Sequence, residues 1–298
     1  MPSRLVTVQD CIDFGEQQFT EAGLHFGHGT DNAADEALWL VFHQLQLPWD
    51  SDQTVLQTAV GHEDYQAIQQ LFQQRIQQRV PAAYLTREAW FAGIPFSVNE
   101  QVLVPRSPIA ELIQQGYQPW LNHPAPQILD LCTGSGCIGI ASAMYLQSAR
   151  VVLSDISPGA IAVANANIHR HQLTDRVVTV TSDVFGGLPG QQFDLIVSNP
   201  PYVDAQDYAA MPAEYHAEPV LGLTSGTDGL DLTRRILREA AVHLTGRGIL
   251  IVEVGNSWQH LEAAFPQIAF TWIEFEFGGH GVFVMTKQEL EEYRAAWG

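Results

Sequence analysis

A short apolar stretch, followed at once by a glycine-rich turn and an alanine-rich segment, constrains the fold of this chain most strongly. Residues 128–131 are apolar apart from Asp130, and the segment 130–136 reads Asp-Leu-Cys-Thr-Gly-Ser-Gly. Gly134 and Gly136 permit the positive φ angles and close backbone approach that a ligand-binding turn requires. A strand that enters such a turn and continues into a helix predicts the first half of a βαβ unit.

From about Gln127 onward, the chain alternates apolar runs with segments of helical periodicity. This alternation predicts a parallel sheet covered by helices. The last two strands follow one another without a helix between them, which predicts a terminal antiparallel hairpin. The fold class is therefore α/β, with a doubly wound, mainly parallel sheet. The expected strands cover residues 128–131, 151–153, 177–180, 195–197, 249–254, 268–277 and 282–286, and two of the helices expected between them cover 158–170 and 228–243.

The first 88 residues differ, because their apolar residues recur at helical spacing throughout. A Thr-x-x-acid start at Thr7 and Asp10 predicts the first helix. Further helices are expected near 31–45 and 62–80, with a short one after Ser51.

Strand-like alternation lies between this helical region and the sheet region. We expect a β-hairpin with Asn99-Glu100 between its strands, followed by a helix over 106–117. The expected organisation is a helical domain over 1–88, a β-hairpin linker over 89–104 and a sheet domain over 105–298.

The formal net charge is −19, from 14 Lys and Arg against 33 Asp and Glu. Such a surface repels phosphate backbones, so we expect no direct nucleic-acid partner. Complementary charge instead favours a basic protein partner. Acidity of this kind also keeps a protein in solution without having any other role.

The three cysteines are too few and too widely spaced for a disulfide framework, and none has partners at zinc-ligand spacing. We therefore expect no metal. Asp10 and Asp13 occupy the region where a signal peptide would be apolar, and no apolar run approaches the ~20 residues that span a bilayer. The sequence therefore predicts a soluble, cytoplasmic protein with no membrane contact.

A carboxylate follows the second expected strand. Asp155 lies 21 residues after Gly134, where an acid would accept hydrogen bonds from ribose hydroxyls. Gly134, Gly136 and Gly139 also satisfy the spacing G-x-G-x-x-G, so these residues alone leave a nicotinamide cofactor open.

The fourth strand runs directly into Asn199-Pro200-Pro201-Tyr202. Together with the glycine turn and the acid after the second strand, this NPPY tetrad resembles the class I methyltransferases that modify amino nitrogens on flat π systems. The resemblance implies S-adenosylmethionine as the methyl donor. The residues that it implies for donor binding are Asp130, Cys132, Thr133, Gly134, Ser135, Gly136, Asp155, Asp183, Val184 and Asn199.

The tetrad suits transfer to a planar amide. A carboxamide nitrogen is a poor nucleophile, because its lone pair is delocalised into the carbonyl group. Two acceptors, Oδ1 of Asn199 and the carbonyl of Pro200, can bind both N–H groups and orient the lone pair for in-line attack. Pro200 and Pro201 rigidify the loop, and Tyr202 offers a flat face for stacking. Glu253 at the end of the fifth strand is expected to be structural or part of the rim.

The whole chain resembles the protein glutamine N5-methyltransferases, which have an N-terminal helical domain, a hairpin linker and a C-terminal methyltransferase domain. One branch of this family methylates peptide release factors at Gly-Gly-Gln, and the other methylates a glutamine of large-subunit ribosomal protein L3. The second branch is favoured here, in part because Cys132 stands where the release-factor branch usually has glycine. The other cues for this branch are segments 81–86, 89–93 and 102–109.

Several alternatives stay open from the sequence. The release-factor branch has the same chemistry, and a nucleic-acid adenine methyltransferase would have a related tetrad. A non-catalytic adenosylmethionine-binding assembly factor is the alternative of another class, although such a protein has no need for an intact Asn199. The helical domain is expected to dock the substrate or simply to cap the sheet domain.

Overall fold

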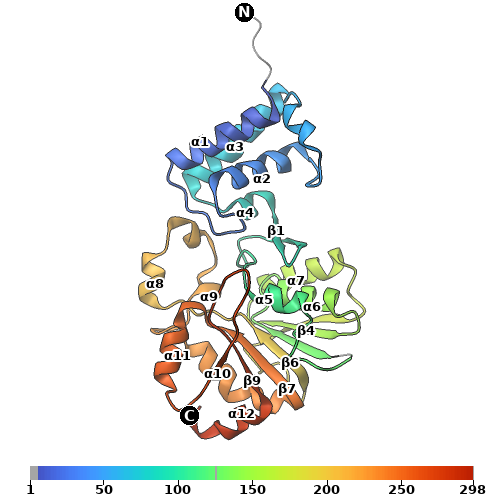
Figure 1. Ribbon diagram of the computed structural model, residues 1–298, viewed down its shortest axis with the longest axis vertical. Helices are drawn as coiled ribbons and strands as arrows, with labels where there is room; N and C mark the ends of the chain where they lie inside the picture. The colour runs from blue at the N-terminus through green and yellow to red at the C-terminus, as the bar shows by residue number, and fades with distance from the viewer. Residues whose placement is uncertain (1–5, 125, 298) are drawn as a thin grey trace, which may run out of the picture. The chain divides into compact units, whose positions relative to one another are not determined.

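The structure is a computed structural model that describes residues 6–124 and 126–297 (Figure 1). The described residues form two compact units. The first unit contains the described residues up to Glu88 together with Pro212–Ala217, and the second contains Ala89–Met211 and the residues from Glu218 onward. No described helix has both the length and the apolar character needed to cross a membrane.

The first unit is helical, as its apolar spacing predicts. Thr7 caps its first helix through a reciprocal capping box, in which Oγ1 of Thr7 accepts from the backbone N–H of Asp10 and the carboxylate of Asp10 accepts from the backbone N–H of Thr7. Phe19 and Phe72 meet edge to face between two of the helices, with ring centroids 5.1 Å apart. The elements are α1 (Val8–Glu21), α2 (Ala33–Leu45), the 3₁₀ turn η1 (Gln53–Gln57), α3 (His62–Gln78) and α4 (Ala82–Thr86).

A buried ion-pair network also stabilises the first unit. Arg75, with only 1% of its side chain exposed, donates from Nε to Oε1 of Glu36 at 2.6 Å and from Nη1 to Oε1 of Glu214 at 3.2 Å. Glu214 belongs to the 3₁₀ turn η2 (Ala213–Ala217), which follows the NPPY tetrad in the chain. A segment that begins in the sheet region therefore supplies a buried carboxylate to the helical unit.

The β-hairpin is present, but its position differs from the expected one. Its strands are β1 (Glu88–Phe91) and β2 (Ile94–Ser97), so the turn lies at Ala92-Gly93 rather than at Asn99-Glu100. Ala92 and Gly93 both have positive φ, 50° and 77°, as a tight two-residue hairpin turn requires. Residues 102–104, which would have formed the strand after a turn at Asn99-Glu100, form no strand.

The second unit contains a seven-stranded sheet in the order β5-β4-β3-β6-β7-β9-β8, which confirms the doubly wound α/β fold (Figure 1). The five strands from β5 to β7 are parallel. Strand β9 is antiparallel to both β7 and β8, which confirms the terminal antiparallel hairpin. The strands are β3 (Gln127–Leu131), β4 (Arg150–Asp155), β5 (Val177–Thr181), β6 (Phe193–Ser198), β7 (Leu244–Glu253), β8 (Thr271–Trp272) and β9 (Val282–Thr286).

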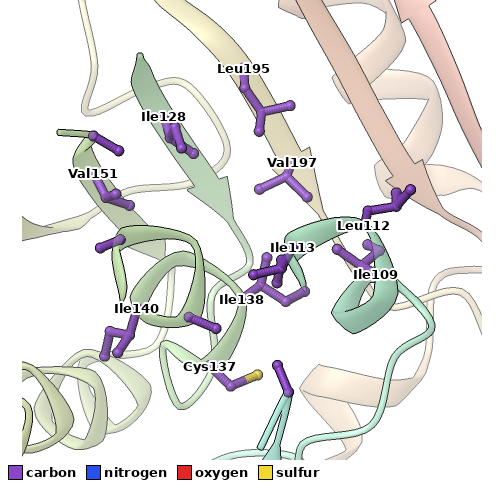
Figure 2. Packing of buried hydrophobic residues seen from close by; sticks show 14 of the residues in the cluster. Ile109, Leu112, Ile113, Ile128, Cys137, Ile138, Ile140, Val151, Leu195 and Val197 are labelled. Atoms are coloured by element: carbon purple, nitrogen blue, oxygen red, sulfur yellow. The ribbon is translucent and has the colours of Figure 1, made fainter. Parts of the chain in front are cut away.

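Apolar side chains project from both faces of this sheet, and each face has its own hydrophobic core. One face packs against α5 (Ile109–Gln114), α6 (Cys137–Tyr145) and α7 (Pro158–Arg170). In Figure 2, side chains of α5 and α6 gather beside Ile128, Val151, Leu195 and Val197 of the strands. The other face packs against α10 (Asp231–Glu239), α11 (Trp258–Ala264) and α12 (Lys287–Glu292).

Some elements differ in extent from the expected ones. Helix α7 has the expected bounds, whereas the expected helix over 106–117 is limited to α5. Strand β8 has only two residues of the expected 268–277, because the ladder with β9 ends at Trp272. The helix expected over 228–243 is divided into α10 and the 3₁₀ turn η3 (Ala240–His243). The sequence did not reveal α4, α11, α12, α8 (Ala205–Ala210), α9 (Val220–Leu223) or the 3₁₀ turns η2, η4 (Gly255–Ser257) and η5 (Arg294–Ala296).

Candidate active site

The glycine turn joins the carboxyl end of β3 to α6. Gly134 and Gly136 have φ of 55° and 82°, and Cys132 also has a positive φ of 59°. A Cβ atom added at Gly134 would meet no atom within 4 Å, so this part of the turn is open. Gly139 differs, because an added Cβ would lie 2.2 Å from Leu153 Cδ2; its role is close packing of α6 on β4.

Asp130 lies beneath this turn and is buried. Its Oδ2 accepts from Oγ1 of Thr133 at 2.5 Å and from the backbone N–H of Gly139 at 2.9 Å. Its Oδ1 is buried without a hydrogen-bond partner among the described residues. Burial raises the pKa of the Asp130 carboxyl to about 7. A buried acceptor of this kind would be satisfied by a cationic or N–H donor of a ligand.

Asp155 ends β4 beside the turn. Its Oδ2 accepts from the backbone N–H of Gly134 at 3.0 Å, and its Oδ1 accepts from that of Ser157 at 2.9 Å. Burial is the main influence on the Asp155 carboxyl and raises its pKa. A carboxylate oxygen can accept two hydrogen bonds, so each of the two Asp155 oxygens can accept one more from a ribose hydroxyl.

The segment after β5 adopts a constrained conformation. Val184 has a φ of 50°, which is unusual for a β-branched residue, and Oγ of Ser182 donates to its carbonyl at 2.7 Å. Asp183 is exposed, and its Oδ1 accepts from Nη1 of Arg235 at 2.7 Å. Phe185 is buried in the core, and its ring stacks on His243 at 4.5 Å between centroids.

Strand pairing brings the glycine turn and the NPPY tetrad to one edge of the sheet. Strands β3 and β6 are parallel neighbours in which Leu131 is the register partner of Ser198. The chain continues from Leu131 into the turn and from Ser198 into Asn199. The strand order reverses at β3, which has β4 on one side and β6 on the other. Open α/β sheets bind ligands at the carboxyl ends of the strands at such a reversal.

The side chain of Asn199 is hydrogen-bonded through its NH₂ group. Nδ2 approaches the carbonyl oxygen of Arg106 at 3.5 Å, and the side-chain amide also lies beside the carboxylate of Glu253. Because both partners are acceptors, they orient the NH₂ end of the amide toward themselves. Oδ1 of Asn199 is then the end left for a ligand.

Tyr202 is anchored at three points. Its hydroxyl donates to Oε1 of Glu253 at 3.1 Å, and its carbonyl accepts from Oγ of Ser257 at 2.7 Å. Its ring lies against Gly255, where an added Cβ would be 2.5 Å from Cε2 of the ring. The tyrosine therefore braces the loop in this structure.

Glu253 is more central than the sequence indicated. It is buried at the end of β7, and its Oε2 accepts from Oγ of Ser107 at 2.5 Å. Burial raises the pKa of its carboxyl to about 7. Its sequence position offered one signal, because β7 pairs with β6 and the residue follows Val252, the register partner of Ser198. An acid at the carboxyl end of a strand next to β6 lies near whatever follows β6.

Residues 104–107 also lie at this edge. Arg106 makes a bidentate ion pair with Glu218, from Nη1 at 2.8 Å and from Nη2 at 2.6 Å, and Oε1 of Glu218 also accepts from the backbone N–H of Val104. Glu218 is buried, so the guanidinium and the backbone amide compensate its charge. This pairing fixes the segment that supplies the carbonyl of Arg106 to Asn199.

Comparison with known proteins identifies the family. The family described as "Methyltransferase small domain" matches residues 118–215. The chain is 47% identical over 297 residues to a "Ribosomal protein uL3 glutamine methyltransferase" of Francisella tularensis subsp. tularensis, covering 99% of this chain and 95% of that protein. A protein of the same name from Xanthomonas campestris pv. campestris is 49% identical, with 98% of this chain and 94% of that protein covered. The chain belongs to the ribosomal protein uL3 glutamine methyltransferase family.

Solved structures agree on the fold. The hMettl16 catalytic domain, in complex with MAT2A 3′UTR hairpin 6, has a TM-score of 0.53 and 14% identity, and the match covers 76% of this chain and 82% of that one. At this identity the likeness concerns the fold alone. Membership of the uL3 glutamine methyltransferase family confirms the expected family and branch, and shows that the chain is a methyltransferase. The glycine spacing therefore belongs to a methyltransferase and not to a nicotinamide enzyme.

Proposed function

We propose that this enzyme transfers a methyl group from S-adenosylmethionine to the side-chain N5 of a glutamine in ribosomal protein uL3. The observation that carries the proposal is the pairing of β3 with β6, which brings the open turn at Gly134 and the amide of Asn199 to the same sheet edge. The names of the relatives support uL3 as the substrate.

The residues around the turn fit the methyl donor. The open space at Gly134 can admit a ligand close to the backbone, and the unpaired Oδ1 of Asp130 suits the ammonium of its methionine part. Asp155 would accept hydrogen bonds from the ribose hydroxyls, while Asp183 and Val184 would lie at the adenine. Asp183 would have to bind the adenine amino group beside Arg235. When bound, S-adenosylmethionine supplies an electrophilic methyl group on a positively charged sulfur.

The NPPY tetrad would position the acceptor amide. Oδ1 of Asn199 and the carbonyl oxygen of Pro200 accept the two N–H groups of the glutamine NH₂, which turns the nitrogen lone pair toward the methyl group. The new bond joins N5 to the methyl carbon as the sulfur–carbon bond breaks. N5 carries positive charge until it loses one proton to water, so no strong base is required. The same acceptors stabilise that developing charge.

The helical unit is the proposed docking element for uL3. The sequence has 12 acidic and 4 basic residues up to Glu88, and two of those arginines, Arg75 and Arg79, are paired with carboxylates inside the unit. The remaining surface is anionic, which suits a basic ribosomal protein. Because the substrate is a ribosomal protein, we place the reaction in the cytoplasm.

A hollow on this unit adds a specific feature to the docking proposal. It is lined in part by Trp39, Phe42, Trp49 and Glu88. Trp49 is 47% exposed, and its ring stacks on Phe42 with the centroids 5.6 Å apart. Aromatic faces beside a carboxylate suit the cationic side chains of lysine and arginine. A basic segment of uL3 is the occupant that we propose.

A methyl-transfer assay tests the proposed function. Isotopically labelled S-adenosylmethionine is supplied with purified uL3 or, separately, with a peptide release factor, and the product is mapped by mass spectrometry. Label on one uL3 glutamine is expected. Label only on the release factor would overturn the substrate and retain the chemistry, whereas donor binding without label on either would point to a non-catalytic role or another acceptor.

A further inference from the structure

Glu253 is surrounded by hydrogen-bond donors from two parts of the second unit, the segment at Ser107 and the NPPY loop. Oε2 accepts from Oγ of Ser107 at 2.5 Å, Oε1 accepts from the hydroxyl of Tyr202 at 3.1 Å, and the side-chain amide of Asn199 lies beside the carboxylate. Two of these three donors belong to the NPPY loop (199–202). The carboxylate is buried, with 4% of the residue exposed, so water does not compete freely for these bonds.

The neighbouring groups determine the direction of at least one bond. Oγ of Ser107 accepts from the backbone N–H of Ile109 at 3.1 Å, so its own proton is available for Glu253. An ionised carboxylate has only acceptors and can receive all the surrounding bonds, whereas a protonated one has to donate one itself. With the hydroxyls of Ser107 and Tyr202 both donating, the arrangement corresponds to ionised Glu253.

The ionised state of Glu253 bears on the amide of Asn199. An amide has a donor end and an acceptor end that are nearly equal in shape, so its orientation depends on its partners. The carbonyl of Arg106 and the carboxylate of Glu253 are both acceptors, and together they hold the NH₂ end. Loss of the charged acceptor would remove a main reason for Oδ1 to point toward a ligand.

We propose that Glu253 is a positioning residue of the NPPY loop, whose ionised carboxylate holds the hydroxyl of Tyr202 and the NH₂ group of Asn199 so that Oδ1 of Asn199 is presented to the substrate amide. The inference rests on the proposed function for the identity of that amide. Through Ser107, the same carboxylate ties the loop to the 102–109 segment that distinguishes the uL3 branch in the sequence.

Charges around Glu253 make this arrangement dependent on pH. Burial raises the pKa of its carboxyl to about 7, while the hydrogen bonds and the positive charge of Arg106 act in the opposite direction. Arg106 is itself paired with Glu218, and Tyr202, which is also titratable, contacts Glu253 through its hydroxyl. Protonation of Glu253 below about pH 7 would replace an acceptor by a donor and release part of the loop.

The first test compares Glu253→Gln with the unmodified enzyme in uL3 methylation across pH 5.5–9. Glutamine keeps the size but places an NH₂ group among donors. We expect kcat to fall about ten- to a hundredfold at pH 8. The rise of kcat through about pH 7 should disappear. The affinity for S-adenosylmethionine should change less than about twofold. The control is Glu291→Gln on α12, whose exposed carboxylate pairs with Lys287, and which should retain both rate and profile. An unchanged kcat and pH profile in Glu253→Gln would overturn the proposal.

A second measurement needs no methyl acceptor, so it separates this inference from the proposed function. The side-chain ¹⁵N–¹H resonances of Asn199, assigned by their loss in Asn199→Asp, are followed across the same pH range. We expect them to shift with a midpoint near pH 7 in the unmodified and Glu291→Gln proteins, and to stay constant in Glu253→Gln. Resonances that ignore pH in the unmodified protein would contradict the positioning role, even if uL3 is methylated. If the resonances titrate as expected but uL3 is not methylated, the proposed substrate is contradicted and the positioning role of Glu253 is not.

Discussion

Oγ of Ser198 donates a hydrogen bond to the carbonyl oxygen of Leu131 at 2.7 Å, and the two residues are register partners on adjacent parallel strands. The next residues of the two strands are Cys132, which enters the glycine turn, and Asn199, which begins the NPPY loop. The two partners are 67 positions apart in the sequence, and the pairing of their strands places them side by side. The proposed site for the methyl donor and the proposed acceptors for the glutamine amide can therefore act on the same methyl group.

Replacement of Asn199 by alanine should reduce turnover and leave donor binding intact. The change removes one of the two proposed acceptors for the glutamine N–H groups, so kcat should fall about a hundredfold or more. The measurements are steady-state methylation of uL3 and calorimetry with S-adenosylmethionine. Asn256→Ala is the matched control, because the Asn256 amide contacts His280 and has no proposed part in catalysis. Equal turnover in Asn199→Ala and in the control would remove Asn199 from the mechanism.

Replacement of Asp155 by asparagine should weaken donor binding. A charged acceptor contributes about 1.5–3 kcal/mol to a hydrogen bond, which corresponds to roughly a ten- to hundredfold increase in Kd for S-adenosylmethionine. Calorimetry measures this directly. Asp175→Asn changes an exposed acid in the connection before β5 and serves as the control. If both variants bind the donor like the unmodified enzyme, the ribose lies elsewhere.

Asp130 should make stability depend on pH. Its folded-state pKa of about 7 lies above the ordinary value of 3.8, so the folded protein binds more protons than the unfolded chain between about pH 4 and pH 7. The stability contributed by the protonated group is therefore lost as the pH rises through about 7. Urea unfolding at pH 5 and pH 8 should show a smaller loss of unfolding free energy in Asp130→Asn than in the unmodified protein. An equal loss in both would show that Asp130 titrates normally.

The buried arginine of the helical unit should be far more important for stability than its neighbour. Arg75→Met would leave Glu36 and Glu214 buried without their shared cation, at a cost of about 3–5 kcal/mol. Arg79→Met provides the comparison, since this partly exposed arginine also reaches Glu214 but should cost only about 1 kcal/mol. Urea unfolding followed by circular dichroism measures both. Similar losses in the two variants would show that burial of Arg75 is not decisive.

Trp49→Ala tests the docking hollow on the helical unit. Its exposed ring is proposed to receive a basic side chain of uL3, so KM for uL3 should rise about three- to thirtyfold, in line with a cation–π contact of roughly 0.5–2 kcal/mol. The value of kcat and the Kd for S-adenosylmethionine should stay constant. Trp120→Ala, which removes an exposed tryptophan of the other unit, is the control. Equal KM values in the two variants would place docking on another surface.

Much of this protein follows from its sequence because the signals are local. Apolar strands that alternate with helices predict a doubly wound sheet, and the final pair of strands predicts its antiparallel edge. The Thr7 capping box and the bounds of α7 depend on residues only a few positions apart, and both agree with the structure. The glycine turn and the NPPY tetrad are also short local motifs, so they predict the methyl-transfer chemistry from the sequence.

The sequence predicted the wrong position for the hairpin turn, because two nearby segments can both form a turn. The hairpin turn lies at Ala92-Gly93, although Asn99-Glu100 has the composition of a turn. The structure places residues 99–102 in a turn as well, with the backbone N–H of Val102 bonded to the carbonyl of Asn99, but without a second strand after it. Only packing decides which of two acceptable turns joins paired strands. The same applies to β8, whose length depends on its pairing with β9.

The sequence by itself determined the fold class, the family and the residues expected to bind a methyl donor and an amide. The tertiary structure decided the surroundings of those residues: that Glu253 lies against Tyr202 and Asn199, and that Glu214, beyond the NPPY loop, is buried beside Arg75 of the helical unit. The physical reason is that the partners of these two carboxylates lie far away in the sequence, where no local pattern reveals them. The burial, the pKa and the role of each carboxylate depend on which donors the folded chain brings to it.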